Sequence, residues 1–564
     1  MIKSNIKNLL KKAVKMEGFE LEVFVSEKDD FGHYSTNAAL KLAKIKSENP
    51  MAIAEKIKAA LSDRIARIFF QKIEVAAPGF INFWLSEKVL QNELKEILKR
   101  KEKYGKTTLR QAQGKKIQIE FISANPTGPL TLANGRGGFM GDVLSNILEF
   151  LGYKIEREYY INDTGNQILT LGKSILAALG LLEEAHLTGS GQAPLTGSGQ
   201  ENFYKGGYVK EWAYKNSLKV KKFKNNPMKV GQMAAADFLK EIKLVIKKAG
   251  INFNRWTSEE KDIHKKSFIK KMLEIFKKTH LASSGQAHLA SSGQGLTYEK
   301  DGALWLKTTD FGDEKDRVLI TKDKFPTYFL ADSGHFLETK NRGFDKKIMI
   351  LGPDHYGYVN RAKAAAKILG FENLEIIITQ AMRLMSGNEE VKMSKRSGEF
   401  ITFEELLKEV GIDAARFFFL THSPETHMDF DLDLAKEHSM KNPVYYVQYA
   451  AVRCQSIIKK VSSIKYQVSN VDFKLLNTKE DLNLMRILAR FSEVVNEAGE
   501  KYNPQILARY SLELARQFHN FYEKERIIGE KKNLMLARLE LIKATQIIFK
   551  NIFKLLGIAM PKKM

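Results

Sequence analysis

Apolar residues follow two alternating periods through the middle of the chain. "KIQIEFIS" (116–123) is a short strand-like run, and after the loop "ANPTGPLTLANG" the stretch "RGGFMGDVLSNILEFLG" has apolar residues at helical spacing up to Gly152. "YKIEREYYIND", "KKIMILGPDHYG" (346–357) and "NLEIIITQAMRL" are further strand-like runs, and "RAKAAAKILG" is helical. Strands that alternate with helices predict an α/β fold with a parallel sheet.

Two loops follow directly on predicted strands. "SANPTGPL" comes after the first strand, and "GPDHYG" comes after the strand that begins at 346. Ligands of open parallel sheets bind beyond the carboxyl ends of the strands. We therefore expect both loops at the ligand-binding edge of this sheet.

The two ends of the chain have different patterns. Residues 1–100 mix both periods: "GFINFWL" (79–85) predicts a strand, and a helix follows with Ser86 as its N-cap and a stop at Gly105. From about 440 onward the pattern is helical nearly throughout, which predicts a bundle. We expect three domains: α+β over 1–100, α/β over 110–435 and all-α over 440–564.

Two segments have tandemly repeated, low-complexity sequences. They are "LTGSGQAPLTGSGQ" (187–200) and "HLASSGQAHLASSGQ" (280–294). Neither carries enough apolar mass to form a core, so both are expected to be solvated loops.

Composition narrows the choice of partner and compartment. The 564 residues carry a net charge of +24, which favours a polyanionic partner such as nucleic acid, although a lysine-rich solvated surface gives the same total. The single cysteine, Cys454, excludes an internal disulfide and a multi-cysteine zinc site. No apolar run is long enough to span a bilayer or to serve as a signal peptide, so we expect a cytoplasmic protein.

The segment "PLTLANGRGGFMGD" (129–142) suggests phosphate binding without matching a common motif. It lacks the terminal Lys and Ser/Thr of a P-loop and the G-x-G-x-x-G spacing. Asn134-Gly135 is a hairpin signal, but a helical pattern follows where a second strand would be needed. On its own, the segment leaves a plain strand-to-helix turn open.

A second segment changes this interpretation. "EEVKMSKRSGEFITFEEL" (389–406), taken with the first loop, resembles the two signature loops of class I aminoacyl-tRNA synthetases. The KMSK match is specific, whereas Thr131, Leu132, Ala133 and Asn134 stand where the family has His-Ile-Gly-His. "EFISANPTGPL", "FGHYSTNAALKLAK" (31–44), "TYFLAD" (327–332), "GPDHYGYVNRAKAAAKILG" and "NPVYYVQYAAVRCQSI" resemble the arginyl-tRNA synthetases in particular, in the expected order.

The resemblance covers nearly the whole chain except the two repeats, and it implies both fold and reaction. It implies a tRNA-contacting α+β domain (1–100), a Rossmann-like class I catalytic domain (110–435) and a helical anticodon-binding domain (440–564). The implied enzyme is an arginine–tRNA ligase that forms arginyl-adenylate from ATP, with Mg²⁺ on the nucleotide, and then charges the terminal adenosine of its tRNA. A monomer and a tRNA-dependent first step are also implied.

For the nucleotide, the resemblance assigns residues in both signature loops. Lys392 and Lys395 would stabilise charge on the phosphates, and Thr131 and Asn134 would act as neutral donors in place of the usual histidines. The other expected ATP-binding residues are Pro126, Gly128, Leu130, Gly135, Gly137, Met393, Ser394 and Arg396. The glycines would allow the nucleotide to approach the backbone closely.

For arginine, a pocket needs acceptors that match a planar, charged group with five donors. By resemblance it consists of Glu120, Ser123, Asn125, Tyr328, Asp332 and His355. His355 beside Asp354 could be a zinc ligand, but no second ligand lies at suitable spacing, so no metal site is expected. In the C-terminal region Tyr449 is a candidate for stacking on tRNA bases.

Two alternatives stay open at this stage. The altered first signature is compatible with a catalytically weakened tRNA-binding paralogue, against which the intact KMSK sequence argues. Another class I synthetase would share both loops, whereas "TYFLAD" and "DHYGY" fit an arginine site.

Overall fold

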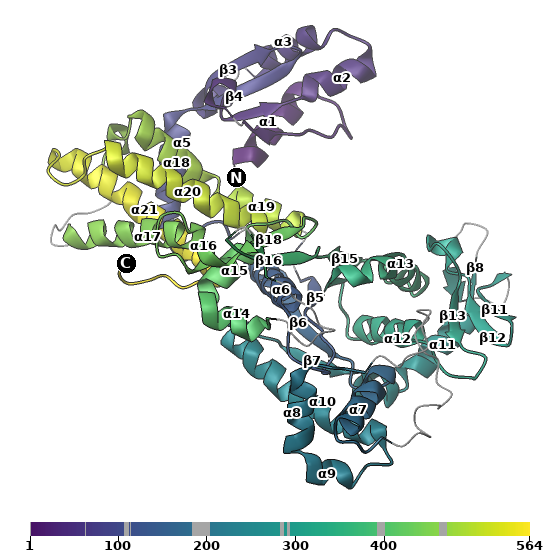
Figure 1. Cartoon of the computed structure of the whole chain (residues 1–564). Coiled ribbons are helices and arrows are strands. Elements are labelled where there is room, and N and C mark those ends of the chain that lie inside the picture. Colours follow the sequence, from purple (N-terminus) through teal and green to yellow (C-terminus); the bar gives the residue numbers. More distant parts are fainter. Residues whose placement is uncertain are drawn as a thin grey trace. The chain divides into compact units, whose positions relative to one another are not determined.

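The computed structural model describes residues 2–26, 28–61, 64–106, 112, 114–182, 203–281, 287–289, 294–387, 389–391, 401–461 and 471–564 (Figure 1). The chain divides into two compact units: Met1–Thr107 together with His438–Met564, and Thr108–Glu437. The KMSK segment, the first repeat and most of the second repeat lie outside the described residues.

The second unit is built on a parallel five-stranded sheet in the described part of the chain. Its order is β15-β14-β5-β6-β7, and every pairing is parallel. The strands are β5 (Lys116–Glu120), β6 (Lys154–Ile161), β7 (Arg255–Ser258), β14 (Lys346–Leu351) and β15 (Leu374–Ile378). The predicted α/β class is therefore confirmed.

The strand order creates a switch point beside β5. From β5 the chain passes through α6 (Leu132–Phe150) to β6 on one side, whereas β14 pairs with β5 on the other side and continues through α13 (Val359–Ile368) to β15. The carboxyl ends of β5 and β14 thus lead into loops that diverge, which is where α/β sheets bind ligands.

One predicted strand is in fact two. The run "NLEIIITQAMRL" forms β15 in the main sheet and then β16 (Met382–Ser386), which pairs with β17 (Glu389–Glu390) and β18 (Met428–Asp431) in a separate sheet. Thr379, Gln380 and Ala381 separate the two strands, and the backbone N–H of Gln380 donates to the carbonyl of Pro424 instead of continuing a ladder. A continuous apolar run does not reveal such a change of partner.

A helical layer is inserted between β6 and β7. It comprises α7 (Asn166–Ala178), α8 (Gly207–Lys215), α9 (Ser217–Lys221) and α10 (Pro227–Lys248). Helices α7 and α10 cross closely at Gly172 and Gly231, where a Cβ atom on Gly172 would lie 1.8 Å from the carbonyl oxygen of Pro227. Larger residues at this crossing would force the helices apart.

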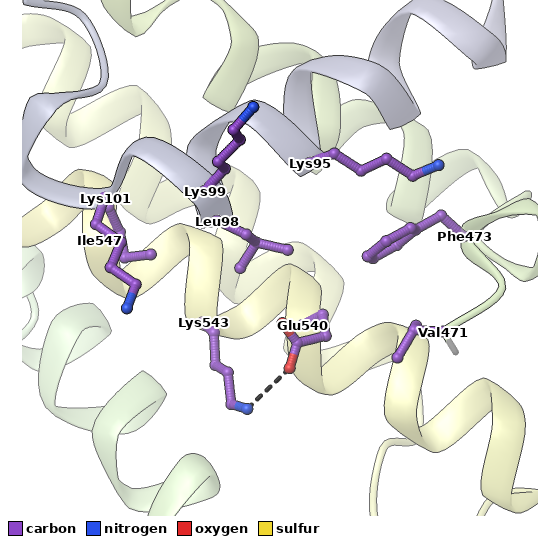
Figure 2. Close-up of a pocket in the computed structure, with 9 residues that line it drawn as sticks. All are labelled: Lys95, Leu98, Lys99, Lys101, Val471, Phe473, Glu540, Lys543 and Ile547. Carbon is purple, nitrogen blue, oxygen red and sulfur yellow. Dashed lines mark hydrogen bonds and ion pairs between the residues drawn. The ribbon is translucent and has the colours of Figure 1, made fainter. Parts of the chain in front are cut away.

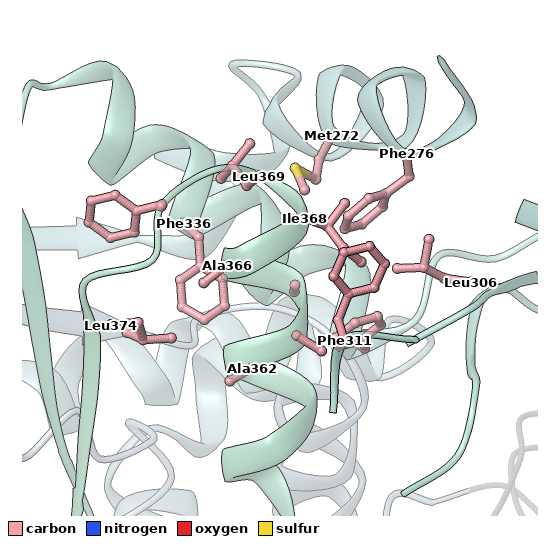
Figure 3. Close-up of a cluster of buried hydrophobic side chains, with 14 of the residues drawn as sticks. Met272, Phe276, Leu306, Phe311, Phe336, Ala362, Ala366, Ile368, Leu369 and Leu374 are labelled. Carbon is pink, nitrogen blue, oxygen red and sulfur yellow. The ribbon is translucent and has the colours of Figure 1, made fainter. Parts of the chain in front are cut away.

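A hydrophobic core fixes the helix that carries two candidate residues. Helix α12 (Tyr328–Asn341) packs with α11 (Phe268–Lys278) and α13, and Figure 3 shows Phe336 with Met272, Phe276 and Ala366 in this cluster. Strand β12 (Ala303–Leu306), which pairs with β11 (Thr297–Lys300), adds Leu306 to the core, and β13 (Arg317–Ile320) adds Leu319. The first turns of α12, with Tyr328 and Asp332, therefore have a rigid support.

The second repeat departs from the expected loop. The backbone forms short antiparallel strands β8 (Thr279–Leu281), β9 (Ala287–Leu289) and β10 (Gln294–Gly295), and His280 pairs with His288. The prediction of a plain solvated loop was wrong for this segment. Backbone ladders need no apolar side chains, and the duplicated His-Leu-Ala units give both strands the same alternation.

Three further helices belong to this unit and follow the second signature in the sequence. They are α14 (Phe403–Val410), α15 (Ile412–Leu420) and α16 (Leu432–Lys436). Arg416 is 1% exposed as a side chain, and its Nη1 lies 2.5 Å from Oδ2 of Asp142 on α6. Because a buried arginine needs such a partner, this pair ties α15 to the helix that follows the first signature loop.

The first unit contains a small α+β region and a helical bundle. The α+β region has a sheet of order β1-β2-β4-β3 with helices α1 to α4, and the bundle contains α5 and α17 to α21. Ser86 caps α5 as predicted, accepting from the N–H of Val89. The bounds are α1 (Ile2–Val14), β1 (Phe24–Val25), β2 (Tyr34–Thr36), α2 (Ala38–Lys46), α3 (Pro50–Ala60), α4 (Arg64–Phe69), β3 (Phe70–Ala76), β4 (Phe80–Leu85), α5 (Glu87–Arg100), α17 (Pro443–Lys460), α18 (Lys479–Ala489), α19 (Phe491–Glu500), α20 (Gln505–Lys524) and α21 (Lys532–Leu556).

Within the described ranges, no helix is both long enough and apolar enough to cross a membrane.

Candidate active site

The first signature loop ends in a capping box. The backbone N–H and the hydroxyl of Thr131 both donate to Oδ1 of Asn134 at 2.9 Å, and the N–H of Asn134 donates to Oγ1 of Thr131 at 3.4 Å. Thr131 thus uses its hydroxyl hydrogen inside the loop. The side-chain NH₂ of Asn134 has no hydrogen-bond partner among the described residues, so it is the group that this pair can offer to a ligand.

The same loop is joined to the segment that follows the second signature. Thr131 forms an isolated antiparallel bridge with Thr402, and the N–H of Phe403 donates to the carbonyl of Leu130 at 2.9 Å. Lys392, Met393, Ser394, Lys395 and Arg396 lie outside the described residues. The structure therefore places the flank of the second signature, but not its functional side chains.

Internal packing accounts for two of the three loop glycines. A Cβ atom on Gly135 would lie 2.3 Å from the ring of Phe403, and one on Gly128 would lie 2.7 Å from the ring of Tyr208. Gly137 differs, because its nearest contact would be an ordinary 3.8 Å to Ile350. Close approach of a nucleotide is thus not needed to explain Gly128 or Gly135, although Pro126 and Leu130 beside them are buried as parts of the same loop.

The backbone is strained where β5 enters this loop. Ile122 and Ser123 have φ values of 64° and 37°. Positive φ is costly for a β-branched residue, and such strain is concentrated at functional sites. Oγ of Ser123 accepts from the N–H of Tyr160 at 3.1 Å, which fixes the turn against the end of β6.

Three carboxylates converge beyond the sheet edge: Glu120 at the end of β5, Asp332 on α12 and Glu259 in the turn η4 (Glu259–His264). Glu120 has a cation of its own, because the fully buried Nζ of Lys347 lies 2.8 Å from its Oε2. Burial, followed by the charges of Glu259 and Glu120, raises the pKa of Asp332 to about 7, against the opposing effects of Tyr358 and Arg361. A site that resists ionisation in this way favours a bound cation.

The position of Glu259 is set from the end of the neighbouring strand. Asp163 accepts from Oγ of Ser258 at 2.6 Å and from the N–H of Glu260 at 3.0 Å. Glu259 is 4% exposed and begins a π-helical turn, a rare feature that often occurs at functional sites. Its neighbours on both sides are thus held. Oε1 of Glu259 lies 3.2 Å from Nε2 of His264, and the charge of Glu259 acts on Asp332.

Comparison with known proteins agrees with this geometry. Residues 93–425 match the model for tRNA synthetases class I (R), catalytic domain; residues 1–85 match the arginyl tRNA synthetase N terminal domain; and residues 447–564 match the DALR anticodon binding domain. The chain is 38% identical over 561 residues to the arginine–tRNA ligase of Carboxydothermus hydrogenoformans, covering 97% of this chain and 94% of that one. This chain belongs to the arginyl-tRNA synthetase family.

A further relative and a solved structure are consistent with this family membership. The arginine–tRNA ligase of Bacillus pumilus is 39% identical over 544 residues, covering 94% of this chain and 92% of that one. The arginyl-tRNA synthetase structure from Thermus thermophilus has the same fold, with a TM-score of 0.73 at 20% identity and full coverage of both chains. The Rossmann-like catalytic domain and helical C-terminal region expected of the family are thus confirmed.

Of the six residues that the family resemblance assigned to arginine, Ser123 lies in the strained turn after β5, and the other five fall into two groups. Glu120 and Asp332 belong to the carboxylate cluster, and His355, which is exposed in η6 (Pro353–Tyr358), has its ring 6.3 Å from that of Tyr358. The second group lies at the start of α7: the hydroxyl of Tyr328 accepts from the N–H of Asn166 at 3.3 Å, and the amide of Asn125 donates to Gln167.

Sequence reasoning missed three residues that belong to the cluster. Glu259 lies in "WTSEEKDIH", which has the pattern of a solvated charge run and gives no signal. Tyr160 and Tyr358 have pKa values raised well above the ordinary value by burial and by the nearby carboxylates. Tyr358 lies inside the quoted motif "GPDHYGY" and could have been selected from it.

Deeper in the sheet, Glu158, His335 and Glu338 lie close enough to share a metal ion. Arginines and the histidine already pair with these carboxylates: Arg255 with Glu338 at 2.9 Å, Arg342 with Glu158 at 3.2 Å, and His335 with Glu158 at 2.7 Å. We assign the group to an ion-pair network that fixes β6 and α12.

In the first unit, Tyr449 lies on a half-exposed aromatic surface of α17 and α20. Its ring stacks on Tyr445 at 6.3 Å and on His519 at 5.8 Å, and the guanidinium of Arg453 lies 5.2 Å from it. Rings beside a cation suit unpaired bases.

The same unit contains a cavity of about 620 Å³. Figure 2 shows that Leu98 and Phe473 line it, with Lys95, Lys99 and Lys101 around it. Both signature loops belong to the other unit, so this cavity is not the nucleotide site.

Proposed function

We propose that this protein is an arginine–tRNA ligase that activates arginine with ATP, releases pyrophosphate and then transfers arginine to the terminal adenosine of its tRNA. The observation that carries the proposal is the carboxylate pair of Asp332 and Glu259 beyond the sheet edge, next to the first signature loop. The pair has the sign and the acceptors that a guanidinium requires.

In the arginine pocket, Asp332 and Glu259 accept hydrogen bonds from the N–H groups at two edges of the planar guanidinium. Tyr328 borders the side chain, and Ser123, Asn125 and His355 lie toward the end that carries the amino and carboxylate groups. Glu120 acts mainly through Lys347 and adds negative potential. A lysine side chain brings one compact ammonium, which leaves acceptors of the pair unmatched, and this disfavours it.

At the nucleotide, neither reaction step needs a protein nucleophile, so catalysis rests on positioning and charge stabilisation. Lys392 and Lys395 supply the cations, supported by Met393, Ser394 and Arg396. Pro126, Gly128, Leu130, Gly135 and Gly137 form the backbone wall, and the N-terminus of α6 favours the phosphates.

Within the first loop, Asn134 donates its amide to the nucleotide and Thr131 positions Asn134. The pairing of residues 130–131 with 402–403 supports the meeting of the two signatures. No acidic residue occurs between 121 and 135, which fits Mg²⁺ that arrives on the triphosphate.

For tRNA, we propose that the 1–100 region contacts the body of the molecule, that 110–435 holds its acceptor end and that 440–564 reads the anticodon, with Tyr449 stacking on a base. The half-exposed ring and the adjacent Arg453 support this role. The family further suggests a monomeric, cytoplasmic enzyme whose first step needs tRNA.

Arginine-dependent exchange of pyrophosphate into ATP, measured with and without tRNA, tests the proposal. We expect exchange with arginine when its tRNA is present. Exchange with another amino acid would indicate a different class I synthetase, and tRNA binding without exchange would indicate a weakened paralogue.

A further inference from the structure

One surface of the catalytic unit is far more basic than the chain as a whole. Residues 205–229 contain eight lysines and one glutamate, whereas the entire chain of 564 residues has a net charge of +24. These residues form α8, α9, the turn that follows and the first residues of α10. The charge per residue is several times the chain average, so a generally lysine-rich composition does not explain it.

Three lysines of this segment, Lys219, Lys221 and Lys222, form no salt bridge among the described residues. All three are exposed, and none lies within 4.0 Å of a carboxylate in that part of the chain. The carboxylate of Asp237, on which the charge of Lys219 acts, is already bound by Lys240 at 2.9 Å and by the indole N–H of Trp212 at 3.2 Å. The surface therefore keeps a net positive charge.

Apolar rings are interleaved with this charge. Tyr214 is 64% exposed and Leu218 is 79% exposed, and Phe223 is also exposed. Solvent-exposed aromatic residues beside lysines without salt bridges are typical of surfaces that bind single-stranded RNA or the end of an RNA stem. Bases stack on the rings, and phosphates contact the cations.

This surface begins at the first signature loop. Tyr208, in the first turn of α8, packs on Gly128 of that loop. A helix rises 1.5 Å per residue, so Tyr214 lies roughly 9 Å farther along α8, and α9 follows after one residue. The basic surface thus starts within about 20 Å of the loop, the span of a few nucleotides.

We propose that Lys219, Lys221 and Lys222, with Tyr214 and Phe223, form an RNA-binding surface, the α8–α9 surface, for the acceptor arm of the tRNA. The inference rests on the proposed function, because the terminal adenosine must reach the signature loops. The lysines bind phosphates of the acceptor stem, and the rings meet the unpaired nucleotides that lead into the site.

The test compares two triple variants with the same change of charge. One is Lys219→Gln/Lys221→Gln/Lys222→Gln, and the control is Lys315→Gln/Lys322→Gln/Lys324→Gln, exposed lysines elsewhere in the same unit. Binding of a minihelix that contains only the acceptor arm is measured between 50 and 200 mM salt, together with aminoacylation kinetics of the full tRNA.

We expect the α8–α9 variant to reduce the slope of log Kd against log salt concentration by about three, because each lost phosphate contact contributes roughly 0.9. Relative to the wild type, its loss of affinity should therefore be roughly 40-fold larger at 50 mM than at 200 mM salt. KM for tRNA should rise while KM for arginine and the unfolding temperature stay unchanged. Equal effects of the control, or unchanged minihelix binding, would overturn the inference. If wild-type protein binds the minihelix but never charges tRNA, the proposed function fails instead.

Discussion

Replacing Asp332 by Asn should weaken arginine binding and stabilise the empty enzyme at the same time. The carboxyl group faces Glu259 from η4, Glu120 from β5, Tyr358 from η6 and Arg361 from α13, and burial with the two acids raises its pKa to about 7. The ionised form of Asp332 is therefore unfavourable in the empty enzyme, and a bound cation would offset this free-energy cost.

The loss of arginine affinity follows from the lost hydrogen bond, and its pH dependence follows from this pKa. Loss of a charge-assisted hydrogen bond costs about 1.5–3 kcal/mol, or about 10- to 150-fold in arginine affinity at pH 8. In the wild type only about one tenth of the Asp332 carboxyl groups are ionised at pH 6, so the arginine affinity should fall as the pH drops below 7. The arginine affinity of Asp332→Asn should stay constant in this range.

The stability effect has the opposite sign. Because the folded pKa lies above the ordinary 3.8, the folded state binds the proton more tightly, and wild-type stability is lost as the pH rises from about 4 through 7. The full shift would be worth at most about 4 kcal/mol. We expect a gain on the order of 1–2 kcal/mol for Asp332→Asn at pH 8 and little gain at pH 4, because the position is half-buried.

Titration calorimetry with arginine and thermal unfolding without ligand, each from pH 5 to 8, measure both effects. Asp323→Asn, on the exposed surface of the same unit, is the matched control. An arginine affinity unchanged by Asp332→Asn at pH 8 would remove this carboxylate from the pocket. Lower stability of the variant at pH 8 would refute the electrostatic argument.

Three further changes test the signature loops. Gly135→Ala should destabilise the protein by about 1–3 kcal/mol through overlap with Phe403. Gly137→Ala, whose Cβ would make only an ordinary 3.8 Å contact, should be neutral or stabilising in thermal unfolding; equal effects would refute the packing argument. Asn134→Ala should slow pyrophosphate exchange by roughly 10²–10³, and Asn134→His should retain much of the rate; full activity of Asn134→Gly would end the donor role. Lys395→Ala should lower the single-turnover rate of adenylate formation far more than arginine affinity, and an unchanged rate would exclude its role in the transition state.

Local patterns in the sequence were sufficient for the elements around the site. The strand β5, the loop and α6 were predictable because the apolar period changes from two to 3.6 across a Pro- and Gly-rich turn. The helical C-terminal region followed in the same way. Ser86 was identified as an N-cap because capping depends only on adjacent residues.

Features that depend on distant contacts were not predictable. The carboxylate of Glu259 becomes part of the site only because Asp163, about 100 residues earlier, holds the turn around it. The reason for glycine at 135 lies in Phe403, and the division of one apolar run into β15 and β16 depends on which strands each half meets. The pairing of the second repeat likewise arises between its two copies.

Formation of arginyl-tRNA by the purified protein is the measurement that tests the central claim most directly. Labelled, uncharged tRNA that accepts arginine is incubated with the protein, ATP and one of arginine, lysine or citrulline. The acylated terminal adenosine is then quantified. Citrulline has the shape of arginine without its charge, so selection by Asp332 and Glu259 predicts acylation with arginine only. Acylation with citrulline at a comparable rate, or none with arginine, would contradict the account.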